Sequence, residues 1–192
     1  GGFGASAVNL SGDAIDPARV DAVAVSSNMF PMTAAIAVLG RTLLPADEQP
    51  GALAVVVVSD SLWRGRYGAD PALVGRTIHV NDEPHSVVGV MPPGYGFPIR
   101  ARLWMPLRAD GGITGLDSRD IHVFGRLRNG GTARRVETEL NLVLAQQAVA
   151  SPSTHADRRG FVVPFTELET PRETKTILNV LLGAVALILL VA

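Results

Sequence analysis

The spacing of apolar residues in the first half of the chain predicts short strands and turns rather than long helices. Residues 20–26 alternate between apolar and polar or small side chains, which is the period of a half-buried strand. Residues 54–58 read AVVVV, a largely β-branched run that is typical of a strand covered on both faces. The apolar segment 29–39 predicts a short helix or turn. Residues 1–18 are rich in Gly, Ala, Ser and Asp and are expected to form a loop or the tail of an element.

Turn and cap residues mark the connections between these segments. A polar loop is expected over residues 44–51, which lie between two prolines. Ser59 can cap a short helix over residues 60–67, and Gly68 is placed to end it. Trp63 within this helix is expected to be a core anchor, as is Trp104 further along the chain.

A hairpin is the next predicted feature. Residues 76–80 and 85–91 flank Asn81-Asp82-Glu83-Pro84, which has the composition of a hairpin connection. Residues 103–107 supply one more short apolar strand before a Gly- and Asp-rich loop. The pattern therefore predicts a β-rich unit.

The last third of the chain changes character. Residues 121–127 alternate as a strand, Thr132 is a suitable N-cap for a helix to about residue 148, and residues 161–165 are expected to form another strand. The helix is amphipathic, so the order strand, helix, strand is predicted. Its apolar positions at helical spacing are Ala133, Val136, Leu140, Val143 and Leu144.

Residues 177–192 form an apolar run that contains no charge and one polar side chain, Asn179. A membrane-spanning helix needs roughly 20 apolar residues, so this run predicts the start of a transmembrane helix. The alternative is a buried C-terminal helix of a soluble domain.

Composition narrows the functional classes. The chain has 192 residues, of which 47% are hydrophobic, enough to form a folded core. Lys plus Arg (17) and Asp plus Glu (18) nearly cancel, so nucleic acid is not an expected partner. The absence of cysteine excludes thiolate chemistry and disulfides.

No motif for catalysis or cofactor binding is present. GxxxxGK[ST] and GxSxG are absent, so ATP hydrolysis by this chain and a serine nucleophile elbow are not expected. The histidines form no HxH or HExxH; His79 and His85 could meet across the hairpin, as a metal pair or as a cross-strand pair on a solvated face. The adjacent carboxylates Asp47-Glu48 lie in a turn and are not oriented as an acid/base dyad. We therefore predict no catalytic, cofactor-binding or metal site, and no enzyme activity.

Seven short motifs follow one another along the chain. They are VSSNMF (25–30), LGRT (39–42), VVSDSLW (57–63), RYGADPALVGR (66–76), VVGVMPPG (87–94), LWMPL (103–107) and GRLRNG (125–130). Their order resembles the periplasmic core domain of MacB-like and FtsX-like ABC transporter permeases, especially the permease group abundant in acidobacteria. The resemblance extends from about residue 20 to residue 192.

The resemblance implies an α+β domain between the first two transmembrane helices of a permease. It assigns residues 20–118 to a β-rich extracytoplasmic subdomain, residues 119–170 to the second half of a mixed α/β (βαβ) subdomain, and residues 177–192 to the start of a transmembrane helix. Residues 1–19 would be an incomplete N-terminal segment. The family carries no catalytic residues in this domain.

The resemblance also implies partners and a location. The parent permease would be a homodimer in the cell (inner) membrane, would pair with a cytoplasmic ABC ATPase subunit or domain, and could engage a periplasmic adaptor protein. Residues 20–170 would lie on the periplasmic or extracellular side and would transmit ATP-driven conformational change in order to export or release a substrate. The alternative is a membrane-anchored extracytoplasmic binding module that has no ATPase partner.

Overall fold

The computed structural model describes residues 1–11, 17–108, 122–150 and 159–165. The chain divides into two compact units, Gly1–Arg126 and Leu127–Ala192, which are described here one at a time. None of the helices in the described ranges is both long and apolar enough to span a bilayer. The apolar run at 177–192 lies outside these ranges.

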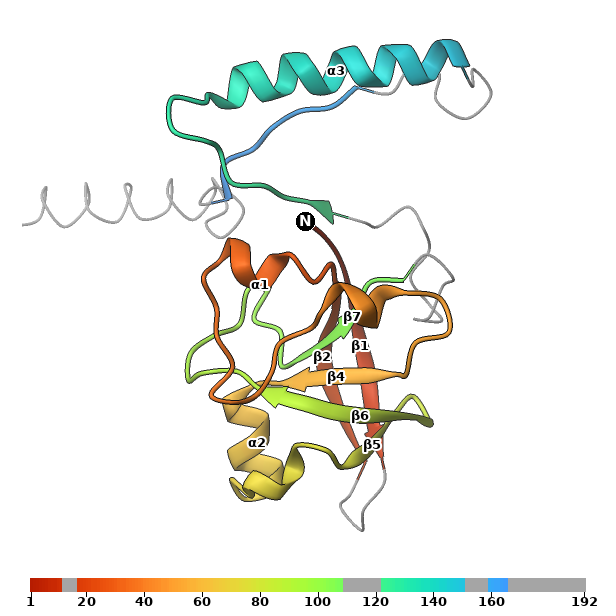
Figure 1. Ribbon diagram of the computed structural model, residues 1–192, viewed down its shortest axis with the longest axis vertical. Coiled ribbons are helices and arrows are strands. Elements are labelled where there is room, and N and C mark those ends of the chain that lie inside the picture. The colour runs from red at the N-terminus through yellow and green to blue at the C-terminus, as the bar shows by residue number, and fades with distance from the viewer. Residues whose placement is uncertain (12–16, 109–121, 151–158, 166–192) are drawn as a thin grey trace, which may run out of the picture. The chain divides into compact units, whose positions relative to one another are not determined.

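Six strands of the first unit close into a ring of mixed parallel and antiparallel pairs (Figure 1). The order around the ring is β2-β7-β4-β6-β5-β1, and β1 pairs with β2 to close it. The pairs β2–β7 and β4–β6 are parallel, and the others are antiparallel. The strands are β1 (Gly2–Ser11), β2 (Ala18–Val25), β4 (Val55–Val58), β5 (Thr77–Val80), β6 (Glu83–Val90) and β7 (Leu103–Pro106).

Residues 1–18 were expected to form a loop or the tail of an element, and residues 2–11 of this segment form the long strand β1. The small residues of this segment have weak intrinsic strand preference. They form a strand because β1 pairs with β2 over eight residue pairs, from Phe3↔Val25 to Leu10↔Ala18. Val8 and Leu10 of β1 are buried in the core. Tertiary pairing therefore outweighs local composition here.

The strands predicted at 20–26, 54–58 and 103–107 are confirmed as β2, β4 and β7. All four valines of β4 are buried, and successive residues belong to different apolar clusters because side chains alternate across a strand. One cluster includes Val56 and Val58 together with buried residues of β1, β5 and β6. The other includes Val55, Val57 and Trp104. Both faces of this part of the sheet are thus covered.

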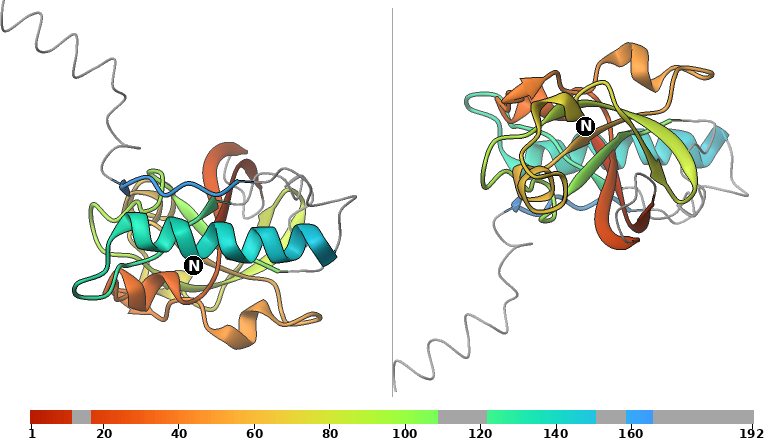
Figure 2. Two further views of the ribbon diagram at one scale, coloured as in Figure 1. Left: turned by 90° about the horizontal axis from the view of Figure 1, so that it is seen from above. Right: turned by 90° about the horizontal axis from the view of Figure 1, so that it is seen from below.

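Short helices cover the strands. Helix α1 (Met29–Met32) contributes Met29 and Phe30 to the second cluster, whereas α2 (Asp60–Tyr67) contributes Leu62 and Trp63 to the first. The predicted cap of α2 is confirmed: Ser59 Oγ accepts a hydrogen bond from the Leu62 amide at 3.1 Å. Two 3-10 helices, η1 (Pro45–Glu48) and η2 (Pro71–Leu73), lie in connections. Both views in Figure 2 show the orange segment with α1 and η1 on the outer side of the strands.

The predicted hairpin is confirmed as β5 and β6, joined by Asn81 and Asp82, which both have positive φ. The sequence allowed His79 and His85 to meet across this hairpin, but the strand register keeps them apart. Their register is offset by one residue, because His79 pairs with Pro84 and His85 pairs with Ile78. Adjacent residues of a strand face opposite sides of a sheet, so the two imidazoles do not meet.

The ends of the first unit lie side by side. A two-residue strand, β8 (His122–Val123), pairs antiparallel with the start of β1, and the strand predicted at 121–127 is therefore shorter than expected. Another short strand, β3 (Leu39–Gly40), pairs with the end of β6.

In the second unit the predicted amphipathic helix is confirmed as α3 (Ala133–Ala150), with Thr132 as its cap residue. The strand expected at 161–165 is wrong, since residues 159–165 include no strand. A strand needs a paired neighbour, and this segment is bound by a side chain instead. In the Asn141 side chain, Nδ2 donates a hydrogen bond to Gly160 O at 2.7 Å, and Oδ1 accepts one from the Gly160 backbone N–H at 3.0 Å. The expected βαβ order is therefore absent from the described residues; the fold is α+β, with a six-stranded mixed barrel.

Candidate functional site

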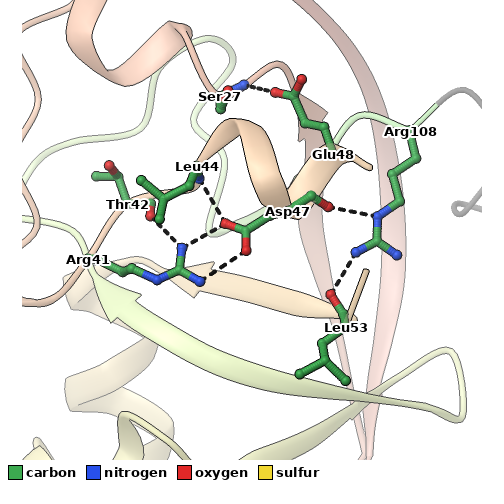
Figure 3. Close-up of polar contacts among 8 residues, drawn as sticks. All are labelled: Ser27, Arg41, Thr42, Leu44, Asp47, Glu48, Leu53 and Arg108. Carbon is green, nitrogen blue, oxygen red and sulfur yellow. Dashed lines mark hydrogen bonds and ion pairs between the residues drawn. The ribbon is translucent and has the colours of Figure 1, made fainter. Parts of the chain in front are cut away.

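The connection between β3 and β4 is held by an ion pair and by hydrogen bonds to backbone atoms (Figure 3). Asp47, in η1, is only 8% exposed. Its carboxylate binds the Arg41 guanidinium through two contacts, Oδ2–Nη1 at 2.6 Å and Oδ1–Nη2 at 3.0 Å. Oδ2 also accepts a hydrogen bond from the Leu44 amide at 2.8 Å, which caps η1. The planar guanidinium and the backbone amide together fix the orientation of this carboxylate.

Two further contacts attach the same connection to distant parts of the unit (Figure 3). Arg108, which follows β7, donates from Nε to Asp47 O at 2.9 Å and from Nη2 to Leu53 O at 2.6 Å. The Glu48 carboxylate accepts a hydrogen bond from the Ser27 amide, just before α1. We call Arg41, Asp47, Glu48 and Arg108 the loop network, because these four side chains hold residues 41–53.

The electrostatics of Asp47 follow from these contacts. Burial alone would raise the pKa of Asp47, but hydrogen bonds from Arg41 and Leu44 and the charges of Arg41 and Arg108 outweigh it. The net effect is a pKa below the ordinary value. Asp47 is therefore a carboxylate at neutral pH and has a structural rather than an acid/base role.

The sequence placed Asp47 and Glu48 in a turn where they do not act as an acid/base pair, and in the structure the two carboxylates bind different partners. The sequence did not indicate a role for Arg41 or Arg108. A Pro at the first helical position followed two residues later by Asp is a local capping signal, so Asp47 could have been found. Arg108 is 61 residues from Asp47, and no local pattern indicates that contact.

A small pocket of about 120 Å³ lies where β4 and β6 begin and β7 ends. His85 is only 6% exposed, and its Nδ1 lies 3.0 Å from Glu83 O. Because a carbonyl oxygen only accepts, Nδ1 is the donor in this hydrogen bond. The pocket is lined by Ala54, Val55, Glu83, His85, Met105, Pro106 and Arg108.

In the described part of the chain, no three His, Cys, Asp or Glu side chains are grouped as metal ligands would be. His122 stacks on Phe3 with 5.0 Å between ring centroids, which gives it a packing role. His155 lies outside the described residues. The prediction that the chain has no metal site stays a prediction.

The start of β1 and the segment after β8 form a paired stem at one place on the first unit. The Gly1 nitrogen donates to Phe124 O and the Phe124 amide donates to Gly1 O, each at 2.9 Å. The Phe124 ring contacts Phe3 and Phe97 at centroid distances of 5.8 and 5.3 Å. Residues 1–3 and 122–124 are thus paired side by side and packed through aromatic rings.

The first unit thus combines a mixed barrel, a paired stem and an ion-pair network around the connection between β3 and β4. A family model described as the MacB-like periplasmic core domain matches residues 3–143. The chain therefore belongs to the family of MacB-like periplasmic core domains of ABC transporter permeases, and the resemblance drawn from the motif order is confirmed.

Solved structures share this fold at low sequence identity. The periplasmic region of MacB from Actinobacillus actinomycetemcomitans is 16% identical with a TM-score of 0.60, over 93% of this chain and 75% of that one. The extracellular domain of the ABC-type transporter YknZ from Gram-positive bacteria is 12% identical with a TM-score of 0.56, over 81% and 78%. A permease domain from Porphyromonas gingivalis is 14% identical with a TM-score of 0.57, over 81% and 69%. A comparison with curated proteins finds no match.

Proposed function

We propose that this domain transmits the ATP-driven movement of a permease to the outside of the membrane, where a substrate is exported or released. The observation that carries the proposal is the family match over residues 3–143. YknZ, which shares the fold, is an ABC-type transporter by description. A role in transmitting movement needs no catalytic group in the domain itself.

The paired stem supports a mechanical role. A displacement of one of these two strands carries the other with it, because the pairs Gly2↔Val123 and Phe3↔His122 couple them directly. The strands β1 and β2 continue from the stem into the barrel over eight residue pairs. A displacement at the stem would therefore reach the barrel as a rigid-body movement rather than as local unfolding.

The proposal includes the partners and the membrane arrangement. A cytoplasmic ABC ATPase subunit or domain supplies the energy, and the parent permease works as a homodimer. Residues 177–192 begin a transmembrane helix in membrane lipid, and residues 20–170 lie outside. Within that part, residues 20–118 are the β-rich subdomain and residues 119–170 the second half of a mixed subdomain. A periplasmic adaptor is a further, optional partner.

Protease accessibility tests the location. In spheroplasts of cells that express the chain, added protease should cleave residues 20–170 while a cytoplasmic marker stays intact. A chain truncated after Arg172 should stay in the supernatant without detergent, whereas the full chain should sediment with membranes. Protection of the domain in intact spheroplasts would contradict the extracytoplasmic location.

Affinity purification tests the transport role. The permease containing this chain should be extracted in mild detergent through a tag on the chain, and ATP hydrolysis should be measured. We expect ATPase activity from a co-purified subunit or a fused domain, with none from the isolated domain. A membrane-anchored domain purified without any ATPase would favour a binding module instead.

A further inference from the structure

Aromatic rings join the stem to a segment that its strands do not pair with. The Phe124 ring lies 5.8 Å from the Phe3 ring and 5.3 Å from the Phe97 ring, measured between centroids. Phe97 belongs to the connection between β6 and β7, residues 91–102. Its ring meets the Phe124 ring at 73°, an edge-to-face arrangement that aromatic pairs favour. The stem is therefore attached to this connection through side chains, in addition to its backbone pairing within the sheet.

The connection is tied in turn to the core of the barrel. Phe97 O accepts a hydrogen bond from Trp104 Nε1 at 2.8 Å, and the Trp104 side chain is fully buried. The Tyr95 ring packs on the Trp104 ring at a centroid distance of 5.5 Å. The Tyr95 hydroxyl lies 3.2 Å from Thr33 Oγ1, directly after α1. A displacement of the Phe97 ring therefore acts on groups that have fixed partners in β7 and beside α1.

The same connection contains a strained turn that presents side chains to solvent. Arg100 has a φ of 50°, in the left-handed region that residues with a Cβ seldom adopt. The Ala101 amide closes this turn by donating to Gly96 O at 2.8 Å. Ile99 is 47% exposed, and Arg100 is exposed as well. Strain of this kind persists only where surrounding contacts hold it, so the conformation of the turn depends on the packing next to it.

We propose that the Phe97–Phe124 contact couples the stem to residues 95–101, so that the local stability of this segment depends on how the stem is held. Coupling of this kind is a free energy shared by two places in a molecule, and loosening one of them loosens the other. As the route by which movement reaches the barrel surface, the coupling rests on the proposed function. As a property of the domain it does not: a failed coupling test would leave the ATPase measurement on the permease unaffected, and the reverse also holds.

Hydrogen exchange of the two indole N–H groups, followed by NMR, tests the coupling in the full chain in detergent micelles. The chain has two tryptophans: Trp104 Nε1 donates to Phe97 O and Trp63 Nε1 donates to Asp70 O, both at 2.8 Å. Trp63 belongs to the other apolar cluster and is the internal control. Phe124→Ala should raise the exchange rate of the Trp104 indole at least about tenfold and leave that of Trp63 within about twofold, since an aromatic contact on one side is lost. An unchanged Trp104 rate, or equal acceleration of both indoles, would overturn the proposal.

Two further variants separate the ring contact from a general effect on the stem. Val123→Ala truncates the neighbour of Phe124 on β8, a side chain that is 84% exposed, and should leave the Trp104 exchange rate within about twofold. Phe97→Ala combined with Phe124→Ala should accelerate Trp104 exchange by less than the product of the two single effects, because both substitutions remove the same contact. An acceleration equal to the full product, or an effect of Val123→Ala as large as that of Phe124→Ala, would overturn the proposal.

Discussion

The two units of this chain use similar apolar residues in different ways. In the barrel, the neighbours Leu103 and Trp104 are both 0% exposed, because each points into a different cluster on its own side of the sheet. On α3, Leu142 remains 59% exposed, and Val143 and Val149 are exposed as well. A strand that is covered on both faces, as β4 and β7 are, buries every side chain, whereas a helix buries only the stripe that another element covers. The strands β4 and β7 therefore bury all their side chains, whereas α3 keeps several apolar side chains exposed.

The ion pairs of the two units differ in the same way. The Arg41–Asp47 pair in the barrel is bidentate and partly buried, and its carboxylate also accepts a hydrogen bond from a backbone amide. Arg135–Glu139 on α3 is a pair four residues apart with a contact of 3.1 Å, and both side chains are mostly exposed. Exposed pairs of this kind are worth little because water and salt screen them.

The largest expected effect comes from the same substitution made in each unit. Leu103→Ala should lower the free energy of unfolding by about 2–5 kcal/mol, because it leaves a cavity in a closed core. Leu142→Ala should change it by no more than about 0.5 kcal/mol, as expected of an exposed position. Urea denaturation followed by circular dichroism measures both. Similar losses for the two variants would show that α3 is covered as fully as the barrel strands.

The next effect concerns the ion pairs. Asp47→Asn should cost about 1–3 kcal/mol, since Arg41 and the Leu44 amide lose a charged acceptor while the partly exposed Arg41 keeps some solvation. Glu139→Gln on α3 should cost below about 0.5 kcal/mol. The same urea titrations, repeated in high salt, compare the two. A larger loss of unfolding free energy from Glu139→Gln than from Asp47→Asn would contradict this difference between the units.

Acid should reveal part of the Asp47 contribution. The folded-state pKa of Asp47 lies below the ordinary value of 3.8, so its stabilisation is fully present above that value and is lost as the pH falls toward the folded-state pKa. The difference in unfolding free energy between wild type and Asp47→Asn should be constant from about pH 7 to pH 5 and smaller near pH 3. A difference that grows on acidification would contradict the assigned sign.

The smallest expected effects concern the helix caps. Ser59→Ala should destabilise the barrel by about 1 kcal/mol, because the amide of Leu62 loses its acceptor in a buried setting. Thr132→Ala should cost about 0.5 kcal/mol or less, since its contact with the Arg135 amide is longer, 3.3 Å, and exposed to water. Thermal unfolding of both variants ranks them. A reversed order would mean that solvent exposure does not govern the value of these caps.

Local signals predicted a large part of the fold. The β-branched run of β4, the cap and end of α2, and the turn of the β5–β6 hairpin each depend on residues close in sequence, and all three are confirmed. The predictions that failed depend on pairing. β1 has small residues but gains partners in β2, β5 and β8, whereas residues 161–165 have an apolar pattern but no strand partner in the described chain.

The candidate site shows the same difference between features that depend on local sequence and features that depend on strand pairing. The sequence showed that no catalytic spacing was present and placed Asp47 and Glu48 in a turn, because such patterns are local. It could not show that Arg108 crosses to Asp47 and Leu53, or that Glu83, His85 and Met105 line one pocket. Glu83 and His85 lie on β6, whereas Met105 lies on β7 and Arg108 follows it, and only the pairing of both strands with β4 brings these residues together.

The sequence by itself determined the short strands, their caps and turns, and the family to which the chain belongs, because these depend on local side-chain chemistry and on the order of motifs. The tertiary structure decided the closed ring of strands, the role of β1, the partners of Asp47 and the offset of His79 from His85. Each of these depends on which strands pair and in which register. A shift of one residue exchanges the two faces of a strand, and the free energy that fixes the register comes from burying both faces of the whole sheet.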